Sequence, residues 1–174
     1  SVPDELSSKE IVFFDLKLKK DFSSLDSPTG YCFICHIPKL SLPDRPAENG
    51  RYLYLDGIQD PSNFGAIIRS ATAFLFDGVF LSQDCVDFFH PKTIRSMAGC
   101  GFGLPIFYSD DCLFEDSIWS SMTWVLFESS GGDSCQSLEL KGPAIFVLGS
   151  EGQGISNRFD SLDSVHRCTI SLSS

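Results

Sequence analysis

The feature that most constrains this chain is a regular alternation of short apolar runs with amphipathic stretches from about residue 50 onward. The apolar runs predict strands at 52–56, 78–82, 105–108, 123–127, 144–148 and 167–172. Helices are expected between and after them, at 64–75, 91–97, 113–120 and 154–163. Because the strands are apolar on both faces and helices separate them, the pattern predicts an α/β fold, with a mainly parallel sheet covered by helices on both faces.

Residues upstream of this alternation have a different character. An apolar run over 31–37 predicts one more strand, and the stretch 38–50 that follows contains three prolines and several polar residues. Such a stretch is typical of a linker. We therefore expect a domain boundary there, with 1–37 belonging to one domain and 51–174 forming another.

Composition excludes several classes of protein. The sequence has no apolar run of eighteen residues and no basic-then-apolar leader at its start, so a cytoplasmic protein without a membrane span is expected. Seven cysteines are dispersed along the chain, and Cys32 and Cys35 lack a second pair nearby. Reduced, mostly buried thiols are therefore expected, and no metal site.

The formal net charge of −10 opposes a general electrostatic grip on nucleic acid. Positive side chains nevertheless fall together in two places. One group is Lys17, Lys19 and Lys20, and the other is Lys92 and Arg95. Local contacts with a polyanion therefore stay open.

A chemically informative segment follows the first strand of the alternating region. Asp60-Pro61 predicts a turn, and Asn63 is expected to be the N-cap of a helix that continues through Ala66. Arg69 lies under two helical turns beyond Asn63, so its long side chain can return toward the loop. Free N–H groups, an amide and a guanidinium predict a site for an anionic or oxygen-rich ligand. On local grounds, Asn63 is explained equally well as a plain helix cap, and Arg69 as a surface ion-pair residue.

A second loop follows the strand at 144–148. It contains three glycines, which let the backbone approach a ligand closely, and Glu151 is its only carboxylate. Ligands of open α/β sheets collect beyond the carboxyl ends of the strands, so both loops are expected at the same edge. A phosphate-binding loop is a competing interpretation, but the Gly-Lys-Ser/Thr ending and the G-x-G-x-x-G setting are both absent. A purely structural loop is a second alternative.

Together the two loops resemble the first two motifs of the SpoU-type RNA 2′-O-ribose methyltransferases, which belong to the trefoil-knotted SPOUT superfamily. The first motif is Asn63-x-Gly65 with Arg69, and the second is the run from Leu148 to Ile155. Between them, the segment 91–100 is similar to the family's proline-then-small-residue segment. The resemblance covers roughly 50–172 and keeps the order and spacing of the motifs.

The resemblance implies transfer of a methyl group from S-adenosylmethionine to a ribose 2′-hydroxyl in structured RNA, with ribosomal RNA favoured over transfer RNA. It implies that Arg69 stabilises the developing alkoxide or a phosphate, since an arginine is a poor base. Asn63 would position the loop or the ribose, and Glu151 would orient Arg69 or polar groups around the substrate. The proton acceptor stays open. The implied cofactor-binding positions are Phe127, Leu148, Gly149, Gly152, Ile170 and Leu172.

The resemblance also implies a homodimer and an RNA-binding segment upstream. Residues 21–31 are similar to the end of a small ribosomal-protein-like domain, so 1–37 is expected to be the tail of such a domain. The family's third motif follows the last strand and completes the knot, whereas this sequence stops at Ser174. Without that motif we expect little cofactor binding and no turnover. A non-catalytic RNA-binding or assembly factor on the same scaffold is thus the alternative, and a nucleotide-binding enzyme using 149–154 is a third possibility.

Overall fold

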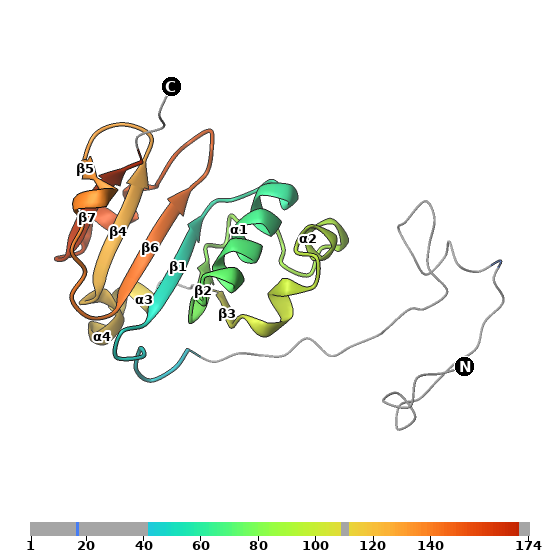
Figure 1. Ribbon diagram of the computed structural model, residues 1–174, viewed down its shortest axis with the longest axis horizontal. Helices are drawn as coiled ribbons and strands as arrows, with labels where there is room; N and C mark the ends of the chain where they lie inside the picture. Colours follow the sequence, from blue (N-terminus) through green and yellow to red (C-terminus); the bar gives the residue numbers. More distant parts are fainter. Residues whose placement is uncertain (1–16, 18–41, 109–111, 171–174) are drawn as a thin grey trace. The chain divides into compact units, whose positions relative to one another are not determined.

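The computed structural model describes Lys17, 42–108 and 112–170. The described residues form one twisted, fully parallel sheet of seven strands, in the order β3-β2-β1-β6-β4-β7-β5 (Figure 1). The strands are β1 (Arg51–Asp56), β2 (Gly78–Leu81), β3 (Ile106–Tyr108), β4 (Thr123–Glu128), β5 (Asp133–Ser134), β6 (Ala144–Gly149) and β7 (Val165–Thr169). The α/β class and the mainly parallel sheet are therefore confirmed.

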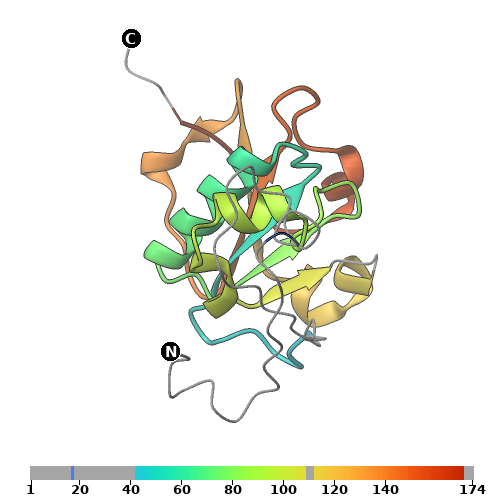
Figure 2. The same cartoon turned by 90° about the vertical axis from the view of Figure 1, so that its right-hand side faces the viewer.

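Helices cover both faces of this sheet (Figure 2). The α-helices are α1 (Pro61–Ala73), α2 (Pro91–Ser96), α3 (Cys112–Glu115) and α4 (Ser117–Ser120). Three short 3₁₀ helices, η3 (Cys100–Gly103), η4 (Cys135–Ser137) and η5 (Asn157–Ser161), complete the described elements. Among these elements, no helix has both the length and the apolar character needed to cross a bilayer.

The alternation of side chains along β1 shows how the sheet divides two cores. Tyr52 and Tyr54 face a largely aromatic core, which receives Trp119 from α4 and Phe159 from η5. Leu53 and its neighbours on the other face contact α1 and the segment around α2 and η3. A strand buried on both faces reads as a continuous apolar run, which explains why the sequence pattern located β1 well.

The strand predictions hold within two residues for β1, β2, β3, β4 and β6. The last strand begins and ends earlier than the predicted 167–172, because β7 pairs with β4 from Val165 to Thr169. The short strand β5 was not predicted. The expected strand at 31–37 lies outside the described residues.

Two helix predictions are wrong. The single helix expected at 113–120 is broken at Asp116, whose extended backbone and side chain cap the start of α4. The helix expected at 154–163 is only the 3₁₀ helix η5. The Asp116 carboxylate accepts the N–H groups of Ile118 and Trp119, which a continuous helix would donate to backbone carbonyls. In the second segment, the extended backbone of Ser156 and Leu162 confines the helix to 157–161.

Residues 42–50 form no helix or strand, yet they contact the domain that follows. The indole N–H of Trp119 donates to the Pro43 carbonyl at 3.3 Å, and the Ala47 N–H donates to the Tyr52 hydroxyl at 3.0 Å. Leu42 packs against the aromatic core. This segment therefore covers part of the domain.

Candidate functional site

The loop after β1 enters α1 through an N-cap at Asp60. Its carboxylate accepts hydrogen bonds from the backbone N–H groups of Ser62 and Asn63, both at 2.9 Å, and Pro61 occupies the first helical position. The prediction that Asn63 is the N-cap is therefore wrong. Asn63 lies at the third position of the helix, where its side chain is free of a capping role.

The loop after β6 closes on itself as a small hairpin. The N–H of Ser150 donates to the Gly154 carbonyl at 3.1 Å, the Gly154 N–H donates back at 2.8 Å, and the Gln153 N–H donates to the Ser150 hydroxyl at 3.1 Å. A Cβ on Gly149 would lie 2.3 Å from the Gly154 carbonyl carbon and oxygen. A glycine is thus required at 149, whereas Gly152 has open space around it.

The two loops meet at the edge formed by the carboxyl ends of the strands. The Asn63 side-chain amide donates to a Glu151 carboxylate oxygen at 2.6 Å, across 88 residues of sequence. This contact is possible because β1 and β6 are adjacent, with Asp56 beside Gly149. After β1 the chain passes to one face of the sheet and after β6 to the other, so the pair spans a topological switch point.

Arg69 lies on α1 and points toward α2. Its guanidinium donates to the carbonyl of Ser96, the last residue of α2, at 2.7 Å, and the side chain is exposed. The structure brings two of the three predicted catalytic residues, Asn63 and Glu151, into direct contact. The third, Arg69, lies six residues beyond Asn63 on the same helix and contacts Ser96 instead.

Gly65 explains why α2 approaches α1 so closely. A Cβ at this position would lie 2.2 Å from the Ser96 hydroxyl oxygen and 2.6 Å from its carbonyl carbon. The Ser96 hydroxyl in turn donates to the Pro61 carbonyl at 2.6 Å. The glycine of the first motif therefore allows the contact that holds the Arg69 guanidinium.

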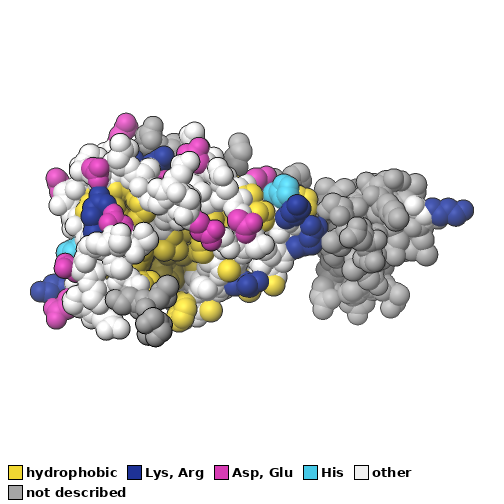
Figure 3. Space-filling model, turned by 90° about the horizontal axis from the view of Figure 1, so that it is seen from above, with side chains coloured by type: hydrophobic (Ala, Val, Ile, Leu, Met, Phe, Trp, Pro, Cys, Tyr) yellow, Lys and Arg dark blue, Asp and Glu magenta, His cyan; other side chains and the backbone are white. Residues whose placement is uncertain are grey.

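Most of the predicted cofactor positions gather beyond β4, β6 and β7. Phe127 lies beside Leu148 in the sheet, and both are half-buried. Ile170, which directly follows β7, is 56% exposed. Figure 3 looks down on this end of the sheet and shows hydrophobic side chains exposed in a hollow among polar loops. Such a surface with backbone groups at its rim suits a planar heterocycle.

Two of the predicted cofactor positions do not share this surface. Gly152 lies on the exposed tip of the 150–154 hairpin. Leu172 lies outside the described residues. Within the described ranges, no group of three His, Cys, Asp or Glu side chains is placed to hold a metal ion.

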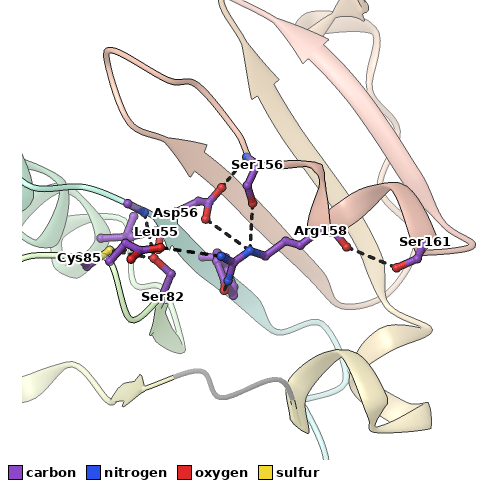
Figure 4. Close-up of polar contacts among 10 residues, drawn as sticks. Leu55, Asp56, Ser82, Cys85, Ser156, Arg158 and Ser161 are labelled. Atoms are coloured by element: carbon purple, nitrogen blue, oxygen red, sulfur yellow. Dashed lines mark hydrogen bonds and ion pairs between the residues drawn. The ribbon is translucent and has the colours of Figure 1, made fainter.

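A buried network that the sequence interpretation missed fastens the second loop to β1 (Figure 4). Asp56 is only 5% exposed, and its carboxylate accepts the Ser156 N–H at 2.7 Å. Arg158 Nε lies 3.8 Å from Asp56 and donates to the Ser156 hydroxyl at 2.9 Å, while its Nη1 donates to the Tyr54 hydroxyl at 3.2 Å. An aspartate at the end of an otherwise apolar strand was the available signal.

The charge state of Arg158 suits this role. Burial lowers the pKa of the guanidinium, but Tyr54, Asp56 and Asp84 together outweigh burial and raise that pKa above its ordinary value. The arginine therefore stays charged beside the buried carboxylate.

A neighbouring set of contacts ties the loop after β1 to the loop after β2. The Gly57 N–H donates to the Ser82 hydroxyl at 2.9 Å, and the Cys85 thiol donates to the Leu55 carbonyl at 3.1 Å. Both contacts lie at the same carboxyl edge of the sheet (Figure 4). The loops that surround Asn63 and Glu151 are thus held from both sides.

A cavity of about 530 Å³ lies elsewhere, along β7 between η5 and the β5 segment. Phe159, His166 and Arg167 contribute to its lining, and the Arg167 guanidinium is held by Glu128 and Asp160. None of the predicted site residues lines it. The cluster at the carboxyl edge therefore remains the candidate functional site.

Known proteins resemble this chain in sequence and in fold. The sequence profile of the SpoU rRNA Methylase family matches residues 50–173. The chain is 35% identical over 106 residues to an uncharacterized tRNA/rRNA methyltransferase of Synechocystis sp., covering 60% of this chain and 39% of that protein. It is 28% identical over 131 residues to the 23S rRNA (guanosine(2553)-2′-O)-methyltransferase RlmP of Bacillus subtilis, covering 75% and 51%.

The fold is also similar to solved structures. The crystal structure of an AdoMet-bound rRNA methyltransferase from Sinorhizobium meliloti matches 75% of this chain and 50% of its own, with a TM-score of 0.66 and 25% identity. The chain spans about half or less of the length of these relatives.

Proposed function

The chain belongs to the SpoU rRNA Methylase family, and on that premise we propose that it transfers a methyl group from S-adenosylmethionine to a ribose 2′-hydroxyl in structured RNA. The observation that supports this most directly is the Asn63–Glu151 hydrogen bond, which joins the two motif loops at the carboxyl edge of the sheet. Ribosomal RNA is the favoured substrate, because relatives are named as rRNA methyltransferases and RlmP as a 23S rRNA 2′-O-methyltransferase.

The chemistry requires a group that stabilises negative charge, because an alcohol is a poor nucleophile at neutral pH. Arg69 fits this need. Its guanidinium has five N–H donors, of which one is used by the Ser96 carbonyl, so others can reach an alkoxide or a phosphate oxygen. We assign it the role of a fixed positive charge rather than a base, since an arginine guanidinium stays protonated in proteins.

Asn63 and Glu151 would fix the ribose. Their mutual hydrogen bond sets the position of an amide and a carboxylate at the loop surface, where the remaining amide and carboxylate atoms can bind substrate hydroxyls. The proton acceptor stays open.

The residues at the carboxyl ends of β4, β6 and β7 fit the cofactor. Phe127, Leu148 and Ile170 offer a partly exposed apolar surface for the adenine ring, and Gly149 offers backbone groups at its rim. When bound, S-adenosylmethionine supplies an electrophilic methyl group. The AdoMet-bound neighbour from Sinorhizobium meliloti supports this cofactor.

Methyl transfer tests the proposal. The full-length protein is incubated with labelled S-adenosylmethionine and rRNA. Incorporation of the label at a ribose 2′-oxygen is expected. Arg69→Ala is expected to lower the rate roughly 10²-fold, while the exposed Arg45 gives a control variant, Arg45→Ala, with the wild-type rate.

Two results contradict different parts of the proposal. An absence of binding at millimolar S-adenosylmethionine would contradict the proposed methyltransferase activity. Wild-type methylation by Arg69→Ala would eliminate only the role of that arginine.

One observation favours a non-catalytic RNA-binding or assembly factor as the second candidate. Glu151 and Arg69 each contact a group within the chain, Asn63 and Ser96 respectively, as expected for residues that serve the scaffold. RNA binding without methyl incorporation in the same assay would support this candidate.

A nucleotide-binding enzyme that uses 149–154 for phosphate receives little support. The N–H groups of Ser150, Gln153 and Gly154 donate within the hairpin, so they do not point together at an anion. Weak or absent binding of ATP and GTP is the expected result of a titration.

We further propose the organisation that the family resemblance implies. It comprises an RNA-binding tail at 1–37, a linker at 38–50 and a methyltransferase domain at 51–174 of the trefoil-knotted SPOUT type, in a cytoplasmic homodimer. Analytical ultracentrifugation tests the dimer, and a concentration-independent monomer at micromolar protein would contradict it.

A further inference from the structure

The hairpin that carries Glu151 projects from the carboxyl edge of the sheet, and residues 151–154 are all exposed. One side of its base is Gly149, the last residue of β6, which is fixed within the sheet. The other side of the base, at 155–156, belongs to no helix or strand. The position of the hairpin therefore depends on the contacts that hold Ser156.

The 3₁₀ helix η5, which follows the hairpin, gives it a rigid support. Phe159 of this helix is fully buried in the aromatic core, and its ring packs edge-on against the ring of Tyr54 at a centroid distance of 5.2 Å. Within the same helix, the Ser161 hydroxyl donates to the Arg158 carbonyl at 3.3 Å. Arg158 therefore lies between a segment anchored in the core and the base of the hairpin.

The guanidinium of Arg158 connects the base of the hairpin to two other segments at this edge of the sheet (Figure 4). Its Nε donates to the Ser156 hydroxyl at 2.9 Å, and its Nη1 donates to the Tyr54 hydroxyl on β1 at 3.2 Å. The Asp56 carboxylate, at the end of β1, lies 3.8 Å from Nε, and the Asp84 carboxylate, in the loop after β2, lies 4.0 Å from Nη2. One planar group with donors in a fixed arrangement thus contacts the hairpin base, β1 and the loop after β2.

Ser156 is held by two charged groups at once. Its N–H donates to the buried Asp56 carboxylate, and its hydroxyl accepts a hydrogen bond from the Arg158 guanidinium. Hydrogen bonds to ionised groups are stronger than those between neutral groups. Loss of the guanidinium removes one of these two contacts and takes the ion pair away from Asp56. The base of the hairpin is then expected to sample other positions.

We propose that Arg158 is a positioning residue for the S-adenosylmethionine site, because it holds the base of the hairpin in the place where Gly149 and Glu151 meet their ligands. This inference rests on the proposed function, since it concerns a loop that carries part of that site. When the binding-competent arrangement of a loop is only fractionally populated, the apparent Kd of its ligand rises by the inverse of that fraction. The bound protein nevertheless has the competent arrangement.

Cofactor affinity and turnover of the full-length protein test this assignment. Arg158→Gln is expected to weaken S-adenosylmethionine binding, measured by calorimetry, roughly 10-fold, as for a competent fraction of about one tenth. The KM for S-adenosylmethionine is expected to rise by the same factor, whereas kcat at saturating cofactor stays within about 2-fold of the wild-type value. A merely structural role predicts the opposite pattern, because a smaller folded fraction lowers kcat and leaves the KM unchanged.

Hydrogen exchange follows the base of the hairpin without any turnover. In the cofactor-free protein, the Ser156 amide of Arg158→Gln is expected to exchange faster than that of the wild type, since its bond to Asp56 opens more often. Saturating S-adenosylmethionine is expected to slow this exchange again. Equal exchange of the Ser156 amide in the two cofactor-free proteins would contradict the role of Arg158.

Arg51 provides a matched control at the other end of the same strands. Its Nη1 donates to the backbone carbonyls of Asn49, Gly50 and Gly142, near the amino ends of β1 and β6. Arg51→Gln therefore also removes an arginine that joins separate segments, but far from the hairpin. A lower melting temperature is expected for this variant, with the wild-type Kd and KM for S-adenosylmethionine.

The outcomes separate this inference from the proposed function. A wild-type Kd in Arg158→Gln, or an equal rise of the Kd in Arg51→Gln, would overturn the assignment of Arg158 and leave the proposed function standing. Where Arg158→Gln does not fold, Arg158→Lys takes its place, with about 3-fold weaker binding expected because an ammonium lacks the fixed set of donors. A wild-type Kd in that variant has the same meaning. Failure of the wild type to bind S-adenosylmethionine would overturn the proposed function and this assignment with it.

Discussion

The loops that carry Asn63 and Glu151 reach the same edge of the sheet by different means. The first is ordered by short-range contacts, since Asp60 caps a helix of 13 residues whose inner side is buried. The second has no such helix behind it and is ordered by its own hairpin and by the Asp56 carboxylate, which binds the Ser156 N–H across 100 residues. The start of the helix in the first loop is thus encoded locally, although Ser82 also holds Gly57 from 25 residues away, whereas the second loop depends on the tertiary structure throughout.

The largest effect is expected in the second loop, at Gly149. Because a Cβ there would meet two backbone atoms of Gly154 at 2.3 Å, Gly149→Ala must open the hairpin and is expected to lower the free energy of unfolding by about 2–3 kcal/mol. Urea denaturation measures this change. Gly152→Ala is the control, with an expected change within about 0.5 kcal/mol, since nothing lies within 4 Å of its added Cβ. Equal effects of the two substitutions would mean that the hairpin is not closed in solution.

Asp56 is expected to have the next largest effect. Asp56→Ala leaves the Ser156 N–H without its acceptor and Arg158 without its buried partner, and it is expected to cost about 2 kcal/mol. Asp56→Asn keeps an oxygen for the Ser156 N–H but loses the ion pair, so a smaller cost is expected. Hydrogen exchange gives a local measurement: the Ser156 amide should lose protection in Asp56→Ala. Unchanged exchange of that amide would show that the second loop holds its position without Asp56.

A smaller effect is expected at Asp60, the N-cap of α1 in the first loop. Asp60→Ala removes the side chain that accepts two N–H groups and is expected to cost about 1 kcal/mol of unfolding free energy. Asn63→Ala is expected to change that free energy by less than about 0.5 kcal/mol, because this side chain does not cap the helix. Thermal unfolding of both variants measures the difference. A larger loss of unfolding free energy in Asn63→Ala than in Asp60→Ala would indicate that Asn63 is the cap.

The smallest effect is expected for the contact between the loops. In a double-mutant cycle with Asn63→Ala and Glu151→Ala, a coupling free energy of about 0.5 kcal/mol is expected, because the hydrogen bond is exposed. Urea denaturation of the four proteins gives this coupling. Strict additivity would indicate that the loops do not contact each other in the free protein.

Much of the fold was predictable because its signals are local. The buried strands around 52–56 and 144–148 are continuous apolar runs, and their boundaries were placed within two residues. The break at Asp116 was missed because the amphipathic pattern continues across it, although its carboxylate caps a new helix. The cap at Asp60 was also readable, since the following Pro61 suits the first position of a helix.

The candidate site was predictable only in part. The resemblance named Asn63, Arg69 and Glu151, but local spacing could not say which of them touch. Asp56 was missed because its partners, Ser156 and Arg158, are about a hundred residues away in sequence. A buried carboxylate is recognised as such only when the groups around it are known.

The sequence by itself determined that two polar loops follow buried strands of a parallel sheet, because apolar periodicity and turn residues act over a few positions. Only the tertiary structure decided that Asn63 contacts Glu151 and that Arg69 contacts Ser96, pairs that are 88 and 27 residues apart. The first contact depends on the pairing of β1 with β6, and the second on the packing of α2 against Gly65. Such contacts arise from strand order and helix packing, which no local pattern encodes.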